Sequence, residues 1–379
     1  MTNEPGADFY VVDSGLGDSL LLCLDDVWIA VDCHLPRSGE NAVWDRYVRL
    51  LVEKRVDRLS ALIISHFHID HFRGAARLIQ WFHEDGRKGI GKVCLTGGFE
   101  LANLVKALWG IYRRTTERGE LAQFAAVLSR YSAPRGPLLV PMLVADSEPM
   151  EIASTADGWH VVAVHPFRIP SSAMVAQAVE AVQNKQRPFL DQNLLSGAYF
   201  VCHRHLKFPL LLLGGDVPGE KPWEDALSFW KRRKEFSPGY DWLPTGMGPV
   251  WIKVPHHGSH THGHSNQLFE AMAPPYDRHA FVTAGADRRK HPARETLIEY
   301  RARKFTLWDT GRLERARPSM QIPAYSFGQQ AFAYGAGAQP PSNEPDPSGV
   351  IQVNWPENRP TPQHARIRPK EIASYPSVP

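Results

Sequence analysis

The chain has 379 residues, of which 43% are hydrophobic and 22% charged, so it is expected to be mostly globular with a large buried core. Its net charge of +3 is too small to indicate a nucleic-acid partner by itself. Scattered cysteines without a Cys-x-x-Cys pair, a start unlike a signal peptide and no apolar run of membrane-spanning length predict a soluble cytoplasmic protein with no membrane partner.

The N-terminal residues predict three strands. Residues 9–12 are β-branched or aromatic, and a Gly-x-Gly turn at 15–17 separates them from the apolar run 20–24, which indicates a hairpin. A third strand is predicted at 27–31, with Asp32 just beyond its end. We expect Asp32 either to hydrogen-bond a metal-binding imidazole or to cap the next segment.

A histidine-rich motif follows the fourth predicted strand. Apolar residues 61–64 indicate a buried strand, which comes after a helix predicted at 42–53 and before another at 76–82. His66 and His68 are two residues apart, so both imidazoles can point to one side of an extended turn. Asp70 and His71 can reach the same hollow from the start of the following helix.

This motif predicts a metal site. Three imidazoles and one carboxylate within six positions suit a divalent cation such as zinc, with manganese or iron as alternatives. The spacing also fits two adjacent ions, one held by the two nearby histidines and one by the Asp-His pair. A chance group of histidines on a surface loop is the alternative, but the position between a strand and a helix favours the metal site.

The middle of the chain is expected to carry a helical insertion. Residues 92–95 predict a strand, and residues 101–131 have helical periodicity that indicates two helices. Arg113, Arg114 and Arg118 give the insertion a basic side, which is more often a solvated face than a ligand-binding surface.

Three later strands end in polar residues that a metal could bind. A strand at 159–164 ends at His165, and a helix at 172–185 and a strand at 197–202 follow. The strand at 209–213 is apolar on both faces and stops just before Asp216, a carboxylate that is costly to bury without a partner. Two bridged metal ions would supply that partner. The strand at 250–255 ends in a second histidine cluster, formed by His256 and His257, with His260, His262 and His264 expected to be exposed.

The C-terminal region completes the domain. Strands are predicted at 280–283 and 305–308, with His291 and a helix at 294–303 between them. We expect one domain over 8–333, with insertions at about 101–131 and 219–247. A Pro-rich, poorly ordered tail is expected over 334–379, with one strand at 350–355.

Together these motifs resemble one branch of the metallo-β-lactamase superfamily, the metallo-hydrolase domain of the DNA-uptake protein ComEC. The branch has six motifs that this chain matches in order. Asp-Val-Gly-Gln-Gly-Asp is similar to residues 13–18, His-x-His-x-Asp-His to 66–71 and Asn-x-x-Ser to 193–196. Thr-Gly-Asp is similar to residues 214–216, Leu-Lys-x-x-His-His-Gly-Ser to 252–259 and Gly-His-Pro to 290–292. The chain departs from them at Leu16, Gly214 and Lys290, and the long separation of Asp216 from His256 implies an insertion.

The resemblance implies an α/β fold, the αββα sandwich, in which two mixed sheets lie face to face with helices outside. It implies that His66 and His68 hold one ion, that Asp70 and His71 hold the other, and that Asp216 bridges them. His256, His257 and His291 are candidates for the remaining positions, and His165 or Asn193 for a further one. A single-metal site is the alternative, and the resemblance favours Asp32 as a partner of a metal-binding imidazole.

The function expected from two divalent ions is that of a phosphodiesterase or nuclease that acts on nucleic acid or nucleotides through a metal-bound hydroxide. Asp70 would bind metal and orient the nucleophile, and Lys253 would either contact a phosphate or face solvent. Basic residues at 113–118, 230–234 and 288–290 favour a polyanionic substrate. The alternatives are a lactone, thioester or phosphocholine-ester hydrolase, and a non-catalytic module with protein partners in a multi-component defence system.

Overall fold

The computed structural model describes most of the chain between residues 7 and 309, together with strands at 350–355 and 366–367. Within 7–309 the description leaves out 13–16, 37–39, 85, 98–99, 113, 133–135, 146–149, 152–157, 205, 207, 237–243, 245–248, 250, 260–265, 272–277 and 284–291. His291, the histidines at 260–264 that were expected to be exposed, and the basic run at 288–290 therefore lie outside the described residues.

The first sheet is mixed. Its strands among the described residues are β1 (Ala7–Val12), β2 (Ser19–Leu24), β3 (Val27–Cys33), β4 (Leu59–Ile64), β5 (Ile90–Thr96), β6 (Met142–Leu143), β14 (Val350–Trp355) and β15 (Arg366–Ile367). They lie in the order β15-β14-β1-β2-β3-β4-β5-β6. The pairs from β1 to β3 are antiparallel, and those from β3 to β6 are parallel.

The second sheet is also mixed. Its strands in the described part are β7 (Met150–Glu151), β8 (Trp159–His165), β9 (Ala198–His203), β10 (Leu211–Leu213), β11 (Trp251–Lys253), β12 (Arg278–Val282) and β13 (Phe305–Asp309). They lie in the order β13-β12-β11-β10-β9-β8-β7. The four strands from β10 to β13 are parallel to one another.

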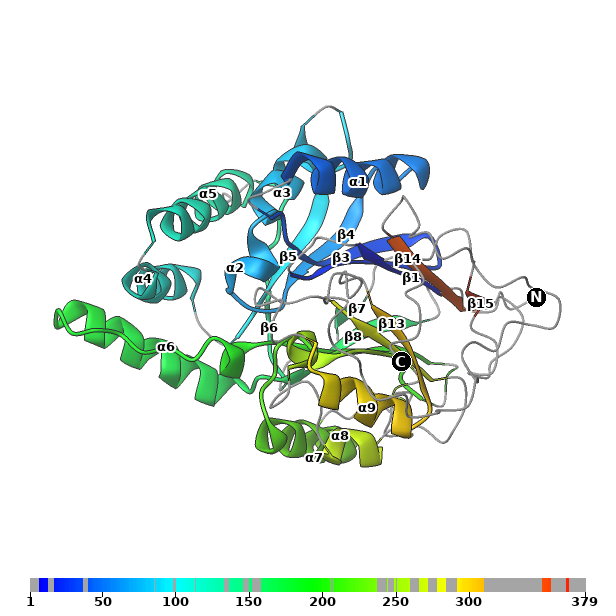
Figure 1. The fold of residues 1–379 in the computed structure, drawn as a ribbon. Helices are drawn as coiled ribbons and strands as arrows, with labels where there is room; N and C mark the ends of the chain where they lie inside the picture. Colours follow the sequence, from blue (N-terminus) through cyan, green and yellow to red (C-terminus); the bar gives the residue numbers. More distant parts are fainter. Residues whose placement is uncertain are drawn as a thin grey trace, which may run out of the picture.

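The two sheets pack face to face, and helices cover their outer faces (Figure 1). Alternate residues of the strands point into the core between the sheets, as the two-residue period of a strand requires. Phe9 of β1 meets Phe281 of β12 there, with ring centroids 4.8 Å apart. The expected αββα sandwich of two mixed sheets is confirmed.

Each outer face has its own helical layer. The first sheet is covered by α1 (Glu40–Glu53), α3 (Ala75–His83), α4 (Leu101–Ile111) and α5 (Thr115–Tyr131). The second is covered by α7 (Glu220–Phe236), α8 (Asn266–Ala271) and α9 (Arg294–Ala302). Helix α6 (Arg168–Gln183) packs beside α4 and projects from the body of the molecule (Figure 1).

Most predicted elements are present, with ends shifted by a few residues. The expected insertion at 101–131 is the helix pair α4 and α5, and α7 lies in the second insertion. The short elements α2 (Ile69–Phe72), α8, β6, β7 and β15 were not predicted. The predicted strand at 350–355 is confirmed as β14, and it pairs antiparallel with β1.

A buried histidine in the second sheet makes the fold sensitive to acid. His279 of β12 is 5% exposed and lies against the rings of Trp251 and Phe281. Burial lowers its pKa to about 4. Because the unfolded chain takes up this proton near pH 6.5, the stability that the neutral ring contributes is present above pH 6.5. It is lost as the pH falls from about 6.5 to about 4, at a cost of up to about 3 kcal/mol.

Replacing His279 by phenylalanine is therefore expected to reduce the loss of unfolding free energy between pH 7 and pH 5. Urea unfolding at several pH values measures this for the variant and the wild type. Equal pH slopes for both proteins would show that this ring does not contribute to the acid sensitivity.

Candidate metal centre

The candidate site lies where strands of both sheets end. Ser65 and His66 follow β4, Asp216 follows β10, and the two adjacent histidines 256 and 257 follow β11. Parallel strands bring their carboxyl ends to one edge of a sheet, and β3–β4 and β10–β12 are parallel. The topology therefore brings together residues that are far apart in the sequence.

The motif after β4 supplies the first group of imidazoles. His66 is buried, and its Nε2 atom lies 3.0 Å from Nδ1 of His68. His71 is carried by the short helix α2, and its ring centroid lies 4.0 Å from that of His66. All three imidazoles of the motif thus lie on the same side of the turn, as predicted.

Asp216 lies at the centre of the cluster. Its Oδ2 atom is 3.6 Å from Nε2 of His66 and 3.7 Å from Nε2 of His256, and its Oδ1 atom is 3.5 Å from Nε2 of His71. Burial raises the pKa of Asp216, but the nearby imidazoles, first that of His257, outweigh burial and hold this pKa well below its usual range. The carboxylate is thus charged and shared between imidazoles on two sides.

His257 joins the two halves of the cluster. Its Nε2 atom is 3.2 Å from Nε2 of His71, 3.4 Å from Oδ2 of Asp70 and 3.7 Å from Oδ2 of Asp216. Burial raises the pKa of Asp70, but the hydrogen bond with His257 and the charge of His71 outweigh burial and hold this pKa below its ordinary value. Asp70 is 13% exposed, so its carboxylate lies near the outer side of the cluster.

Asp32 orients His71 from behind. Its Oδ2 atom lies 2.8 Å from Nδ1 of His71, and its carboxylate also accepts hydrogen bonds from the backbone N–H and the hydroxyl of Ser65. A proton on Nδ1 leaves the lone pair of Nε2 pointing into the cluster. The predicted contact of Asp32 with an imidazole of the histidine motif is confirmed.

The arrangement of acceptors fits a bound cation. The Nε2 atoms of His71 and His257 face each other, while the Nδ1 atom of each ring has a hydrogen-bond partner behind it: Asp32 for His71 and Thr283 for His257. Oδ1 of Asp216 is buried without a hydrogen bond. Lone pairs and carboxylates that converge in a buried space repel one another unless a proton or a metal ion lies between them. Nitrogen and oxygen donors of this kind suit zinc, manganese or iron.

Among the described residues, three groups place ligand atoms within 4.8 Å of one another. Two of them face the hollow: His66, His71 and Asp216, and also Asp70, His71 and His257. The third, Asp18, Asp32 and His71, gathers around Nδ1 of His71 and serves to orient that ring. The first two overlap at His71, whose Nε2 atom could bind only one ion, so two adjacent ion positions would divide these ligands between them.

A strained turn presents the second pair of histidines. His256 and His257 both have left-handed backbones, with φ of +46° and +50°, and Gly258 continues at +73°. A non-glycine residue in this region costs about 1–3 kcal/mol and persists only when its surroundings hold it. Here the His256 N–H donates to the Gly215 carbonyl and the Ser259 N–H to the His256 carbonyl, both at 2.9 Å.

Lys253 lies differently from what the sequence indicated. We expected it to contact a phosphate or to face solvent, but it is 1% exposed and forms an ion pair with Asp18. Burial lowers the pKa of Lys253, but the charge of Asp18 outweighs this and raises it. The ammonium group is therefore a buried partner of a carboxylate and is not presented to a substrate.

His165, one of two residues considered for a further ligand position, lies apart from the candidate groups. It is buried, which lowers its pKa to about 4, and its Nδ1 atom lies 2.8 Å from the Ser196 carbonyl oxygen. In the part of the chain that is described, no candidate group of His, Cys, Asp and Glu side chains includes it. Asn193, the other residue, begins a single 3₁₀ turn (Asn193–Leu195), and its backbone N–H donates to Asp191.

Several contacting residues were not assigned a role from the sequence. Ser196 accepts a hydrogen bond from the Asp216 N–H at 2.7 Å and lies 3.3 Å from Nδ1 of His66. Thr283, at the end of β12, lies 3.1 Å from Nδ1 of His257. Ser196 and Asp18 belong to motifs that the sequence did single out, whereas Thr283 follows an ordinary strand without a recognisable pattern.

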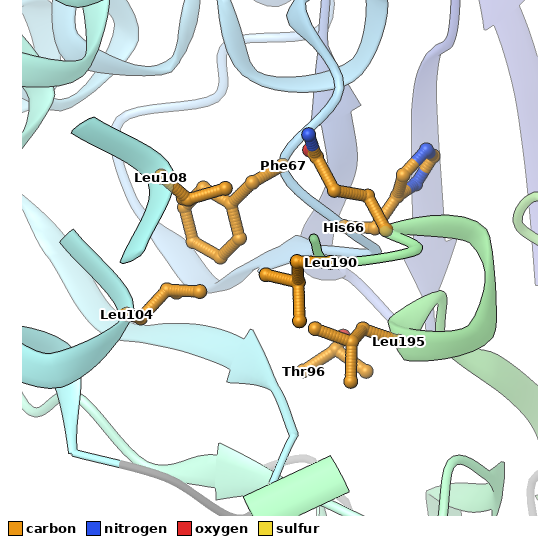
Figure 2. Close-up of a pocket in the computed structure, with 8 residues that line it drawn as sticks. His66, Phe67, Thr96, Leu104, Leu108, Leu190 and Leu195 are labelled. Carbon is orange, nitrogen blue, oxygen red and sulfur yellow. The ribbon is translucent and has the colours of Figure 1, made fainter. Parts of the chain in front are cut away.

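A small apolar pocket adjoins His66. It is lined by His66 and Phe67 after β4, Thr96 of β5, Leu104 and Leu108 of α4, and Leu190, Gln192 and Leu195 before β9. Figure 2 shows the four leucines gathered around Phe67. The first helix of the insertion thus forms one wall of a space beside the cluster.

The basic segments that are described lie on the helices. On α5, Arg118 lies over the ring of Trp109, with 5.5 Å between its guanidinium carbon and the ring centroid, and Arg114 is 4.0 Å from Glu117. On α7, Lys231 and Arg232 are exposed. None of the helices described is both long and apolar enough to cross a membrane.

The chain is similar to known proteins in one region of its sequence. Residues 8–139 match the metallo-β-lactamase superfamily. No curated protein matches the chain in sequence.

Two solved structures give weak matches. The metallo-β-lactamase fold protein YhfI from Bacillus subtilis is 11% identical, with a TM-score of 0.39 over 80% of this chain and 96% of its own. A diphosphatase from the PhnP family is 9% identical, with a TM-score of 0.35 over 80% of this chain and 85% of its own. The family match covers strands β1 to β5 and the histidine motif, and the two-sheet sandwich is consistent with the fold of that superfamily.

Proposed function

We propose that the chain is a metal-dependent hydrolase, and that its main activity is the hydrolysis of phosphodiesters in nucleic acids or nucleotides. The observation that carries this proposal is the convergence of four imidazoles on the buried carboxylate of Asp216, each within 3.7 Å. A site without thiolates, with two neighbouring ligand groups that meet at His71, fits two adjacent divalent ions, with zinc as the first candidate.

The residues of the cluster have separate roles in this proposal. His66, His68, His71, His256 and His257 would hold the ions together with Asp70 and Asp216, and the ions would supply a hydroxide at neutral pH and neutralise charge on the attacked group. Asp216 is shared between the two positions. Asp70 lies on the more exposed side of the cluster, where its free oxygen can accept a hydrogen bond from the attacking water and orient it.

Two features support a phosphodiester. Paired ions stabilise both the attacking and the leaving oxygen of an in-line displacement at phosphorus. The exposed cations just before α5 and on α7 would favour a polyanionic substrate by steering it toward the protein.

The four cysteines are free thiols, which fits a reducing compartment, and we propose a cytoplasmic location on that ground.

A second candidate uses the same cluster on another substrate class. A carboxylic ester, lactone or thioester would place its carbonyl at the cluster, while the apolar pocket beside His66 has room for about one water molecule and does not hold an acyl chain. The two candidates share the metal hydroxide and differ in the group attacked.

Replacing Asp70 by alanine is expected to lower hydrolysis by at least about 10²-fold, because a metal ligand and the contact to the nucleophile are both lost. The wild type and the variant are incubated with zinc or manganese and a panel of labelled single-stranded DNA, RNA, cyclic dinucleotides, a generic phosphodiester, a lactone and a thioester. Asp57→Ala is the matched control, since it removes a surface carboxylate that pairs with Lys88.

The pattern of turnover separates the hypotheses. Phosphodiester cleavage that requires metal and Asp70 supports the main proposal, and turnover of carboxylic esters alone supports the second candidate. A wild-type protein that binds no metal and turns over none of these substrates would refute both and leave a non-catalytic module with protein partners.

A further inference from the structure

A line of hydrogen bonds runs from His257 to a buried ion pair. Nδ1 of His257 lies 3.1 Å from Oγ1 of Thr283, and the Thr283 hydroxyl donates to Oδ1 of Asp18. The other oxygen of Asp18 contacts the ammonium group of Lys253. All four residues are buried, so none of the three behind His257 can reach a substrate.

The direction of these bonds fixes the proton on His257. A hydroxyl has one hydrogen, and that of Thr283 is donated to a carboxylate that has no proton to give. The lone pairs of Oγ1 can therefore only accept a hydrogen bond, and the donor is the Nδ1–H group of His257. The lone pair of Nε2 then points toward Asp70, Asp216 and His71, where a metal ligand needs it.

His71 and His257 are oriented by different hydrogen-bond partners. His71 donates directly to the carboxylate of Asp32, whereas His257 donates to a neutral hydroxyl whose carboxylate is balanced by an ammonium group. Direct contact with a carboxylate polarises an imidazole more strongly than contact through a hydroxyl.

We propose that Thr283, Asp18 and Lys253 form a positioning relay that sets the tautomer and orientation of His257, so that the ion held by Asp70, His71 and His257 depends on Thr283. An ion on the side of His66 and Asp216 would not depend on it, because the single available lone pair of His71, on Nε2, would go to the first ion. The proposal rests on the proposed metal-dependent function, because it concerns the affinity of one of the two ions. It also gives the buried Lys253 a function that needs no contact with substrate.

The test is a comparison of metal affinities in threonine variants. Thr283→Val keeps the shape of the side chain but can neither accept from His257 nor donate to Asp18. Titration of the metal-free protein with zinc against a chromophoric chelator is expected to show one site weakened by about 10–100-fold and the other unchanged. Thr283→Ser restores the hydroxyl and is expected to restore the affinity of the weakened site.

Controls separate this relay from a general effect on folding. Thr296→Val removes another buried hydroxyl, which donates to the Ser259 carbonyl, and is expected to leave both zinc affinities within about threefold of wild type. Circular dichroism of each metal-free variant shows whether it is folded. The absorption spectrum of the cobalt-loaded protein reports the ligand geometry and is expected to change in Thr283→Val but not in Thr283→Ser.

The outcomes are distinct. A folded Thr283→Val protein with two wild-type affinities would overturn the relay while leaving the proposed function intact. Equal weakening of both sites, or no rescue by serine, would assign Thr283 a structural role and would also overturn it. If Thr283→Val does not fold, the zinc affinities of Thr283→Ser are measured instead. The proposal requires both of them to equal those of the wild type. A wild-type protein that binds no zinc would refute the proposed function itself.

Discussion

Replacement of Asp216 by alanine is expected to lower phosphodiester hydrolysis by about 10³-fold or more, a loss of about 4 kcal/mol of transition-state stabilisation. Asp216 is the carboxylate nearest the centre of the cluster, with oxygen atoms 3.5–3.7 Å from the Nε2 atoms of four histidines. Without it, no anionic group is shared between the two proposed ion positions. The remaining imidazoles are then expected to bind at most one ion, and weakly.

The measurement is kcat/KM together with the metal content of the purified variant. Asp225→Ala is a suitable control, because it removes a carboxylate from the exposed side of α7, where Asp225 pairs with Lys221. The Asp216 backbone N–H keeps its bond to Ser196 in the variant, so the chain is expected to fold. Wild-type turnover by a protein without this carboxylate would rule out the cluster as the catalytic centre.

Removal of the metal from the wild-type protein is expected to lower its melting temperature by roughly 10 °C. The cluster places facing nitrogen lone pairs and several carboxylates in a buried space, and a cation that binds only the folded chain stabilises it by mass action. At about 1,000 times the dissociation constant this is worth about 4 kcal/mol per ion, and each kcal/mol shifts the melting temperature by roughly 2–4 °C.

Thermal unfolding with a chelator, then with zinc restored, measures this shift. The Asp216→Ala variant is the control, because its melting temperature is expected to respond little to the chelator. A similar shift in both proteins would show that the metal acts elsewhere on the chain, and no shift in the wild type would show that the folded cluster holds none.

Much of the fold was predictable because short-range patterns decide it. The apolar runs that became β3, β4 and β10 are bounded by polar residues, and strand ends that lie at one edge of parallel sheets must meet. For the same reason, the sequence was sufficient to place Asp32 near the histidine motif and Asp216 among imidazoles.

What the sequence could not give depends on tertiary contacts. The left-handed turn at His256 and His257 has no local signature, because two successive non-glycine residues seldom adopt positive φ and the surrounding structure imposes it here. The burial of Lys253 depends on its meeting Asp18, which is over two hundred residues away in the sequence. Thr283 was missed because a threonine at a strand end is common, and only its contacts distinguish it.

The pairing of β14 with β1 has a consequence for how the protein can be shortened. The two strands pair from Ala7 opposite Trp355 to Val12 opposite Val350, so β14 covers one edge of β1 along its whole length and pairs with its backbone groups there. A truncated protein that stopped after β13 would present those backbone groups as an open template for another chain. Such a fragment would retain the histidine cluster, yet it would be prone to self-association through strand exchange, and loss of activity in it would report aggregation and not chemistry.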